Sequence, residues 1–248
     1  MDHSIEQLQR MIDESSRIVF FGGAGVSTES GIPDFRSVDG LYHMKYKYPP
    51  ETILSATFFH RNTEEFYRFY QDKMLCLDAQ PNAAHKKLAE LERAGKLTAV
   101  VTQNIDGLHQ AAGSRNVYEL HGSVHRNYCT YCHMTDPDAP CYDAQFMKDA
   151  QGVPRCPKCG SVIKPDVVLY EEGLDGATIQ NSVDHIRAAD MLIIGGTSLT
   201  VYPAAGLVEY FHGKYLVVIN KGAQKNTPRA DLIIDGPIGK VLGQIQVR

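Results

Sequence analysis

The sequence of 248 residues has no excess of basic charge and no long apolar run. Its 29 acidic residues outnumber its 25 lysines and arginines and give a net charge of −4, so the charge balance does not favour binding along a phosphate backbone. No apolar stretch reaches the roughly 18 residues that a membrane-spanning helix needs. We therefore expect no membrane association and no direct sequence-specific binding of nucleic acid.

The first residues, MDHSIEQLQRMIDESS, lack the apolar stretch and the small-residue cleavage site of a secretory signal. A cytoplasmic location is therefore predicted. Six cysteines are too few for a disulfide scaffold in a chain of this length, and a cytosolic protein would keep them reduced. The hydrophobic content of 43% is ordinary for a globular protein and allows a sizeable core.

Apolar runs rich in β-branched residues are typical of strands buried on both faces of a parallel sheet. Four are nearly continuous, at Arg17–Phe21, Leu97–Thr102, Met191–Gly195 and Tyr215–Ile219, and weaker ones lie at Val117–Leu120, Val167–Leu169 and Leu232–Ile234.

Helical stretches separate these runs and complete an α/β pattern. The predicted helices are Thr63–Met74, opened by a capping box of Asn62 and Glu65, then Ala83–Ala94 with Gly95 as its C-cap, Asp175–Ala189 and Pro203–Phe211. The alternation favours a Rossmann-like, doubly wound parallel sheet. Only Val124–Lys164, rich in Cys, Pro, Asp and Tyr, breaks the pattern, and we interpret it as a small inserted module.

A glycine-rich segment, Gly22–Ser37, follows the first predicted strand directly. Glycines at this point allow a tight turn and a close approach of the backbone to a diphosphate. The GxGxxG pattern that begins at Gly23 has Thr28 in its third glycine position, and no second strand with an acidic end follows about 20 residues later. The segment indicates nucleotide binding without dehydrogenase chemistry; the alternative is an ordinary glycine-rich turn. Further on, Asp34 and Arg36 either cover a cofactor or form an ion pair that fixes the loop.

Polar or glycine turns follow four of the predicted strands, and such turns along one sheet edge are typical of a dinucleotide crevice. They begin at Gly22, Gln103, Gly196 and Asn220. His121 ends a weaker strand and is followed by glycine, and histidine is the side chain best suited to move a proton near neutral pH. Generic α/β loops are the alternative interpretation.

Two CxxC pairs, Cys129 with Cys132 and Cys156 with Cys159, are the most specific signal. Four thiolates complete a tetrahedral Zn²⁺ site with no open position, so the predicted site is structural. His133 and Cys141 are possible substitute ligands, but neither completes a second pair. A zinc ribbon that binds nucleic acid is the alternative for this module, and the acidic chain argues against it.

Several long motifs occur here in the order in which sirtuins carry them, from about Gly22 to Asn220. They are GAGVSTESGIPDFRS, TQNIDGLHQAAG, ELHG, the two CxxC pairs, GTSL-x-VYPA and VVIN. The chain therefore resembles the bacterial branch of the sirtuin family of NAD-dependent protein deacylases.

The resemblance implies a Rossmann-like NAD-binding domain, with a small domain of helices and a zinc module. The division expected is 1–38, 75–123 and 165–248 for the large domain, 39–74 for the helical part and 124–164 for the zinc module. It further implies that the acyl oxygen of an acylated lysine attacks the ribose carbon bearing nicotinamide. A histidine then deprotonates a ribose hydroxyl, and the products are nicotinamide, free lysine and 2′-O-acetyl-ADP-ribose.

The resemblance also implies roles for matching positions. His121 is the expected general base, with Asn104 and Asp106 beside it as catalytic residues. The expected NAD contacts are Gly22, Ala24, Gly25, Thr28, Phe35, Arg36, Gln103, Asn104, Ile105, Asp106, His121, Gly196, Thr197, Ser198, Asn220 and Ile238. An acetylated-lysine protein or peptide is expected to add as a strand beside Val167, Val168 and Leu169. After these, sirtuins often have Phe-Gly-Glu, whereas this chain has Tyr170-Glu171-Glu172.

Two other functions are compatible with the same motifs. A mono-ADP-ribosyltransferase would use the same cleavage of NAD with another nucleophile, and a non-catalytic module would bind NAD or O-acyl-ADP-ribose only. Intact His121, Asn104 and Asp106 favour deacetylation.

Sirtuins that prefer negatively charged acyl groups carry a Tyr-x-x-Arg pair in the helical part of the small domain. Here Tyr67 fits the first position and Tyr70 stands where the arginine is expected. On a helix, the side chain of Arg68 is turned about 100° from that of Tyr67. Arg68 is therefore not expected to take the place of the missing arginine. The sequence therefore predicts a preference for neutral acyl groups.

Overall fold

The computed structural model describes residues 3–34, 47–136, 138–222 and 229–248. Its larger sheet has six parallel strands in the order β3-β2-β1-β7-β8-β9. Their bounds are β1 Ile18–Gly22, β2 Leu97–Thr102, β3 Val117–Glu119, β7 Met191–Gly195, β8 Tyr215–Asn220 and β9 Leu232–Asp235. The strand order reverses between β1 and β7, which confirms the doubly wound sheet and places the crevice at their carboxyl ends.

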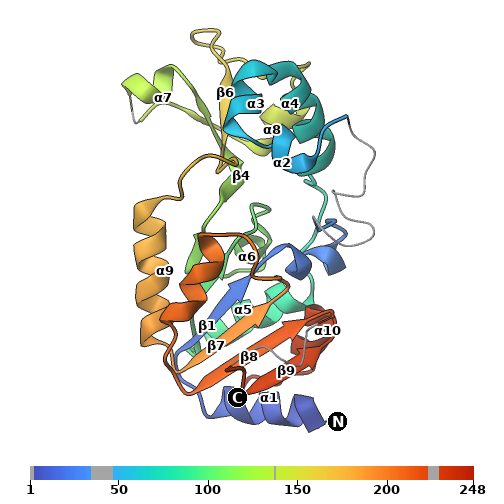
Figure 1. Cartoon of the computed structure of the whole chain (residues 1–248), viewed down its shortest axis with the longest axis vertical. Helices are drawn as coiled ribbons and strands as arrows, with labels where there is room; N and C mark the ends of the chain where they lie inside the picture. The colour runs from blue at the N-terminus through green and yellow to red at the C-terminus, as the bar shows by residue number, and fades with distance from the viewer. Residues whose placement is uncertain (1–2, 35–46, 137, 223–228) are drawn as a thin grey trace.

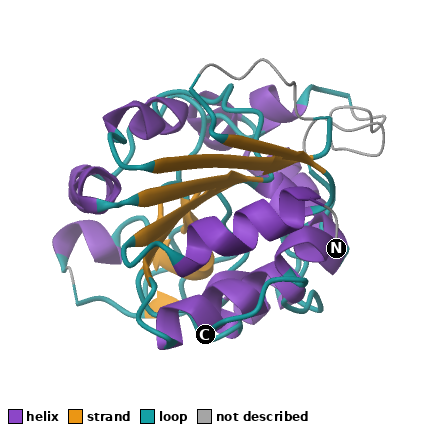
Figure 2. Cartoon of the chain, turned by 90° about the horizontal axis from the view of Figure 1, so that it is seen from below, coloured by secondary structure: helices purple, strands orange, loops and turns teal. Residues whose placement is uncertain are grey.

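Helices cover both faces of this sheet (Figures 1 and 2). Alternate residues of each strand face opposite layers, so Phe20 packs in one apolar cluster and Phe21 in another. The first layer holds α1 His3–Asp13, α5 Ala83–Arg93 and α10 Ile238–Leu242, and the second holds α9 Gly176–Ala188 and the 3₁₀ helix Ala204–Tyr210. The short helix α6, Leu108–Ala111, follows β2. None of the helices in the described ranges is both long and apolar enough to cross a bilayer.

A separate antiparallel sheet in the order β5-β4-β6 lies above the large one in Figure 1. It consists of β4 Gly122–Cys129, β5 Cys141–Tyr142 and β6 Ile163–Val167, with α7 Cys132–Thr135 and α8 Ala144–Asp149 beside it. Four helical segments pack against it, at α2 Pro50–Ile53, α3 Ala56–Arg61, α4 Thr63–Phe69 and the π-helix Tyr70–Met74. Phe66 and Tyr70 from the helices share one apolar cluster with Met147 and Ile163 from the sheet segment, so the two insertions are joined by a common core.

Four local predictions were wrong. The strand expected at Val167–Leu169 is Ile163–Val167, because Tyr170 instead exchanges backbone hydrogen bonds with Leu54 and Ala56. The predicted helix Thr63–Met74 is α-helical only to Phe69 and continues as a π-helix.

The other two errors concern caps and helix type. Asn62 makes no capping hydrogen bond through its side chain, because it is also the C-cap of the preceding helix, with φ −134° and ψ 49°. The helix predicted at Pro203–Phe211 is a 3₁₀ helix, Ala204–Tyr210. In α5, by contrast, Asn82 caps the helix together with His85.

Candidate active site

The glycine-rich turn after β1 packs directly on the turn after β7. The amide of Gly25 donates to the carbonyl oxygen of Gly196 over 2.8 Å, and a Cβ on Gly25 would lie 2.8 Å from that oxygen. Gly196 itself has φ +61°. Both positions therefore require glycine, one for close approach and the other for its backbone conformation. Ala24 lies in a 3₁₀ turn, Ala24–Val26, and Thr28 begins a second one, Thr28–Ser30, so no long helix starts here.

Three polar side chains form a chain of hydrogen bonds beneath this turn. Asn104 Nδ2 donates to Ser27 Oγ over 3.1 Å, and Ser27 Oγ donates to Asp106 Oδ2 over 2.6 Å. The other carboxylate oxygen of Asp106 accepts from the amide of Leu108 over 2.9 Å. Ser27 is 1% exposed and was missing from the sequence prediction. Its place two residues after Gly25 was the only available signal. The sequence does not show which side chains a serine there would contact.

His121 lies at the end of the segment that follows β3, with its ring directed at β2. Its Nδ1 is 3.0 Å from the carbonyl oxygen of Gln103. Because a carbonyl oxygen can only accept, Nδ1 carries a proton, and Nε2 of the neutral ring keeps its lone pair. Burial lowers the pKa of His121, and the bond to Gln103 acts in the opposite direction. The geometry therefore presents a neutral imidazole with Nε2 as the basic nitrogen.

Thr197 connects the other polar strand ends. Gln103 Nε2 donates to Thr197 Oγ1 over 3.1 Å, and Asn220 Nδ2 donates to the Thr197 carbonyl oxygen over 3.2 Å. The Ser198 hydroxyl is hydrogen-bonded to that of Thr200, two residues further on. The carboxyl ends of β2, β7 and β8 are thus brought together, as expected for a crevice at this edge.

Four predicted contacts need separate comment. Phe35 and Arg36 lie outside the described residues. Ile238 is 3% exposed and packs over Gly195, where a Cβ would lie 2.1 Å from Ile238 Cδ1, so its side chain belongs to the core. Ile105 is half-buried and packs against the apolar cluster of the smaller sheet.

The expected peptide segment adjoins His121. The amide of Val168 donates to the His121 carbonyl oxygen over 3.0 Å, directly after Val167 ends β6. Leu169 is 2% exposed, and its amide donates to Glu172 Oε2 over 2.8 Å. Glu171, which has φ +77°, accepts from the amide of Thr57 over 2.9 Å. Both acidic side chains after Tyr170 are therefore already bonded within the chain.

The four cysteines of the CxxC pairs converge on one point between β4 and the loop before β6. Their Sγ atoms all lie within 4.8 Å of one another, with 3.4 Å between Cys129 and Cys159 and 4.0 Å between Cys132 and Cys156. Zinc–sulfur bonds of about 2.3 Å place the sulfurs of a tetrahedral site about 3.8 Å apart. The cluster can therefore hold a structural metal ion, and the four thiolates fit Zn²⁺. Cys141 is exposed and His133 stacks on Tyr128, so neither joins the group.

Two buried histidines form a neutral pair between α5 and α6. His85 is 0% and His109 1% exposed, and their ring centroids are 4.7 Å apart. Burial lowers the pKa of His85 to about 4 and that of His109 to about 3, although the charge of Asp106 opposes the shift in His85. Both rings are therefore uncharged in the folded chain at neutral pH.

This pair makes stability depend on pH. The unfolded chain protonates histidine near pH 6.5, whereas the folded chain does so only near pH 4 to 3. The free energy of unfolding should thus fall as the pH drops below 6.5, by about 1.4 kcal/mol per pH unit for each histidine protonated only when unfolded. Urea unfolding at pH 7.5 and 5.0 measures this. His109→Gln should reduce the pH sensitivity, and exposed His212→Gln should not; equal sensitivity in both variants would contradict the assignment.

The sequence and the structure of this chain are similar to those of known proteins. The model of the Sir2 family matches residues 23–203. The NAD-dependent protein deacetylase of Clostridium acetobutylicum is 59% identical over 241 residues, covering 96% of each chain, and that of Clostridium perfringens is 56% identical over 248 residues, covering 99% of each. Among solved structures, a Sir2 protein with a deacetylated p53 peptide and 3′-O-acetyl-ADP-ribose is 36% identical, with a TM-score of 0.86 and 96% of each chain covered.

Proposed function

The chain belongs to the Sir2 family and is an NAD-dependent protein deacetylase, and we propose that His121 is the general base of its reaction. The observation that carries this proposal is the hydrogen bond from His121 Nδ1 to Gln103, which leaves Nε2 as a proton acceptor. Burial lowers the pKa of His121 and so favours the neutral, basic ring at physiological pH.

NAD, when bound, supplies the ribose to which the acetyl group is transferred as an O-acetyl ester. The protein's own residues provide position and proton acceptance. Asn104 and Asp106 are held by Ser27, which fixes both side chains at the end of β2. In the proposed step, His121 Nε2 accepts the proton of a ribose hydroxyl. Thr197, Gln103 and Asn220 are proposed to contact the nucleotide from the neighbouring strand ends.

A direct assay separates this function from the two alternatives. The protein is incubated with an acetyl-lysine peptide, with and without NAD, and peptide and nucleotide products are followed by mass spectrometry. We expect NAD-dependent loss of 42 mass units (one acetyl group) from the peptide, together with O-acetyl-ADP-ribose. An ADP-ribosylated acceptor would instead indicate transferase activity, and binding of NAD without turnover would indicate a binding module.

We also propose the domain division 1–38, 75–123 and 165–248 for NAD binding, with 39–74 and 124–164 as the small domain. The apolar cluster shared by α4 and β6 supports this grouping. Acetyl-lysine peptides are proposed to add beside Val167–Leu169. A cytoplasmic location is proposed because four cysteines that serve a metal need to stay reduced.

Asp106 should control the response to nicotinamide. Asp106→Asn preserves size but replaces a charged acceptor, and charge-assisted hydrogen bonds contribute about 1.5–3 kcal/mol. We expect the nicotinamide concentration for half-inhibition to rise about ten-fold or more, with weaker productive NAD binding. Exposed Asp78→Asn is the matched control. Unchanged inhibition in Asp106→Asn would count against the contact.

The helical part of the small domain bears on acyl choice. Tyr67 and Tyr70 are both fully buried, and the Tyr67 hydroxyl donates to the carbonyl oxygen of Ile163. The Arg68 side chain is 73% exposed and pairs with Glu65 over 2.7 Å. Arg68 therefore points away from this core, as its helical position predicts.

A succinyl group should be a poor substrate for this reason. A carboxylate buried without a partner costs several kcal/mol, so we expect kcat/KM for succinyl-lysine to be at least about 100-fold below that for acetyl-lysine. Butyryl-lysine on the same peptide is the control, because it has the same chain length without the charge. Equal values for succinyl and butyryl would show that another cation serves the acyl group.

A further inference from the structure

A break in the pairing of β4 with β6 lies directly after the catalytic segment. The register runs Gly122 with Val167 and Ser123 with Asp166, and then resumes at Asn127 with Pro165. Three residues of β4, 124–126, therefore stand opposite no residue of β6. Such bulges redirect a strand and re-aim its side chains. We call residues 124–126 the β4 bulge.

Two residues of the β4 bulge contact the loop that carries Asp106. The amide of Val124 donates to the carbonyl oxygen of Ile105 over 3.0 Å. His125 Nε2 lies 3.0 Å from the carbonyl oxygen of Asp106 and donates to it. The bulge is thus attached to the loop that follows β2.

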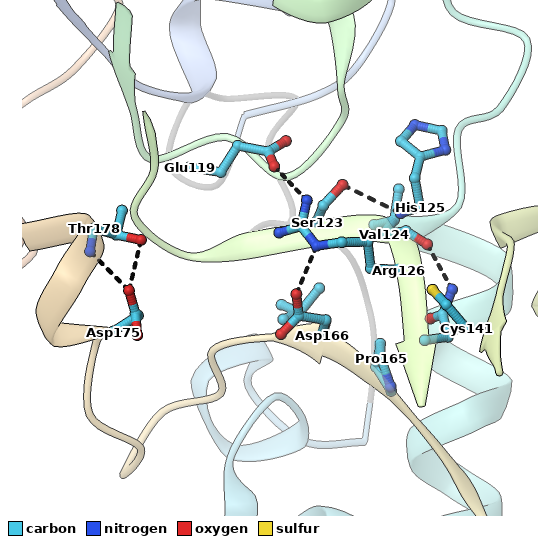
Figure 3. A network of polar contacts seen from close by, with 12 residues as sticks. Glu119, Ser123, Val124, His125, Arg126, Cys141, Pro165, Asp166, Asp175 and Thr178 are labelled. Carbon is cyan, nitrogen blue, oxygen red and sulfur yellow. Dashed lines mark hydrogen bonds and ion pairs between the residues drawn. The ribbon is translucent and has the colours of Figure 1, made fainter. Parts of the chain in front are cut away.

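The third residue, Arg126, lies between the carboxylates of Glu119 and Asp166, which belong to two different chain segments (Figure 3). Its Nη1 is 2.8 Å from Glu119 Oε2, and its Nε is 2.8 Å from Asp166 Oδ2. Glu119 ends β3 two residues before His121. Asp166 lies in β6 two residues before Val168, whose amide binds the His121 carbonyl oxygen. One guanidinium therefore links the segment that leads into His121 with the β6 segment that is hydrogen-bonded to the His121 backbone.

Burial of Glu119 and close backbone packing at Gly122 restrict how the ion pairs of Arg126 can rearrange. The Glu119 side chain is only 6% exposed, so its charge needs a partner within the protein. Gly122 has φ +75°, and a Cβ there would lie 1.9 Å from the carbonyl oxygen of Asp166. The backbones of β4 and β6 are thus in close contact at this point. The two carboxylates raise the pKa of Arg126 above its usual range despite its partial burial.

We propose that Arg126 is a positioning residue for His121, acting through Glu119 and Asp166 and not by contact with substrate or NAD. A planar guanidinium can bond two carboxylates at once, whereas a lysine ammonium is a point charge without that fork. Loss of the link frees the backbone of residues 119–122, and a displacement of about 1 Å in a reacting group can lower a rate about 100-fold. The inference rests on the proposed role of His121.

The experiment compares Arg126→Lys and Arg126→Gln with wild type in the full-length protein. We expect kcat for deacetylation to fall about 10- to 100-fold in Arg126→Gln and less in Arg126→Lys, while KM for NAD changes less than about three-fold. Arg68→Gln removes an exposed arginine from an ion pair of similar length, 2.7 Å, and is the matched control. Circular dichroism and retained NAD binding check that each variant folds.

Two further variants decide between positioning and simple charge balance. Glu119→Gln combined with Arg126→Gln removes both charges; if Arg126 only neutralises Glu119, this pair regains wild-type kcat, and the inference fails. Asp166→Asn keeps the Glu119 pair and should lower kcat by an intermediate factor. His121→Ala is measured in parallel. Its full activity would overturn the proposed function itself, whereas an inactive His121→Ala beside a fully active Arg126→Gln would overturn only the role of Arg126.

Discussion

Replacing His121 by alanine should lower the deacetylation rate by about 10²–10⁴, the range typical of lost general-base catalysis. The reason is specific to the ring. Nδ1 is held by the Gln103 carbonyl oxygen, so Nε2 is the nitrogen left to accept a proton. NAD binding should persist, because the contacts among Gln103, Thr197 and Asn220 do not involve the imidazole.

The pH profile gives this prediction a second test. Since burial lowers the pKa of His121, the acid limb of kcat/KM for the wild type should lie below pH 6.5. Activity is therefore retained at neutral pH and lost as the pH falls through the lowered pKa. The residual activity of His121→Ala should lack this limb, and exposed His212→Ala should keep it. Near wild-type turnover in His121→Ala would refute the assignment.

Removing the metal should unfold the smaller sheet and abolish activity indirectly. The four thiols are all free and gathered around one point, and a closed four-thiolate zinc site contributes to folding and not to chemistry. Cys129→Ser or a strong chelator should lower the melting temperature, because β4 and the loop before β6 are joined through these sulfurs. Activity should be lost in parallel with the metal, as measured by elemental analysis and thermal unfolding.

Cysteines outside the cluster provide the controls for this test. Cys141 is exposed and Cys76 is half-buried, and neither belongs to the four-sulfur group. Cys141→Ser and Cys76→Ser should each retain one zinc per chain and the wild-type melting temperature. Fully active wild-type protein without zinc would exclude a structural metal site.

The sequence by itself determined the class of fold and most of the strands. Apolar runs such as Leu97–Thr102 and Met191–Gly195 are buried on both faces, and that continuous pattern is read without knowledge of their neighbours. The metal site was also predicted from the sequence, because each CxxC pair brings two cysteine ligands together within one short turn. Glycine requirements at Gly25 and Gly196 were indicated by their places after buried strands.

Other features depended on contacts between distant segments. Val167–Leu169 appeared as a strand of its own, but pairing with β4 decided that β6 ends at Val167. Ser27 gained a role only when Asn104 and Asp106, more than 75 residues away, were brought beside it.

The charge and protonation of the site were also decided by the tertiary structure. The tautomer of His121 follows from a carbonyl on another strand, and the link through Arg126 follows from a break in strand pairing. Neither leaves a local pattern in the sequence, because a side chain's partner and its desolvation depend on which segments the fold brings together. Local propensity and periodicity therefore determined the elements, and long-range packing determined how they form a site.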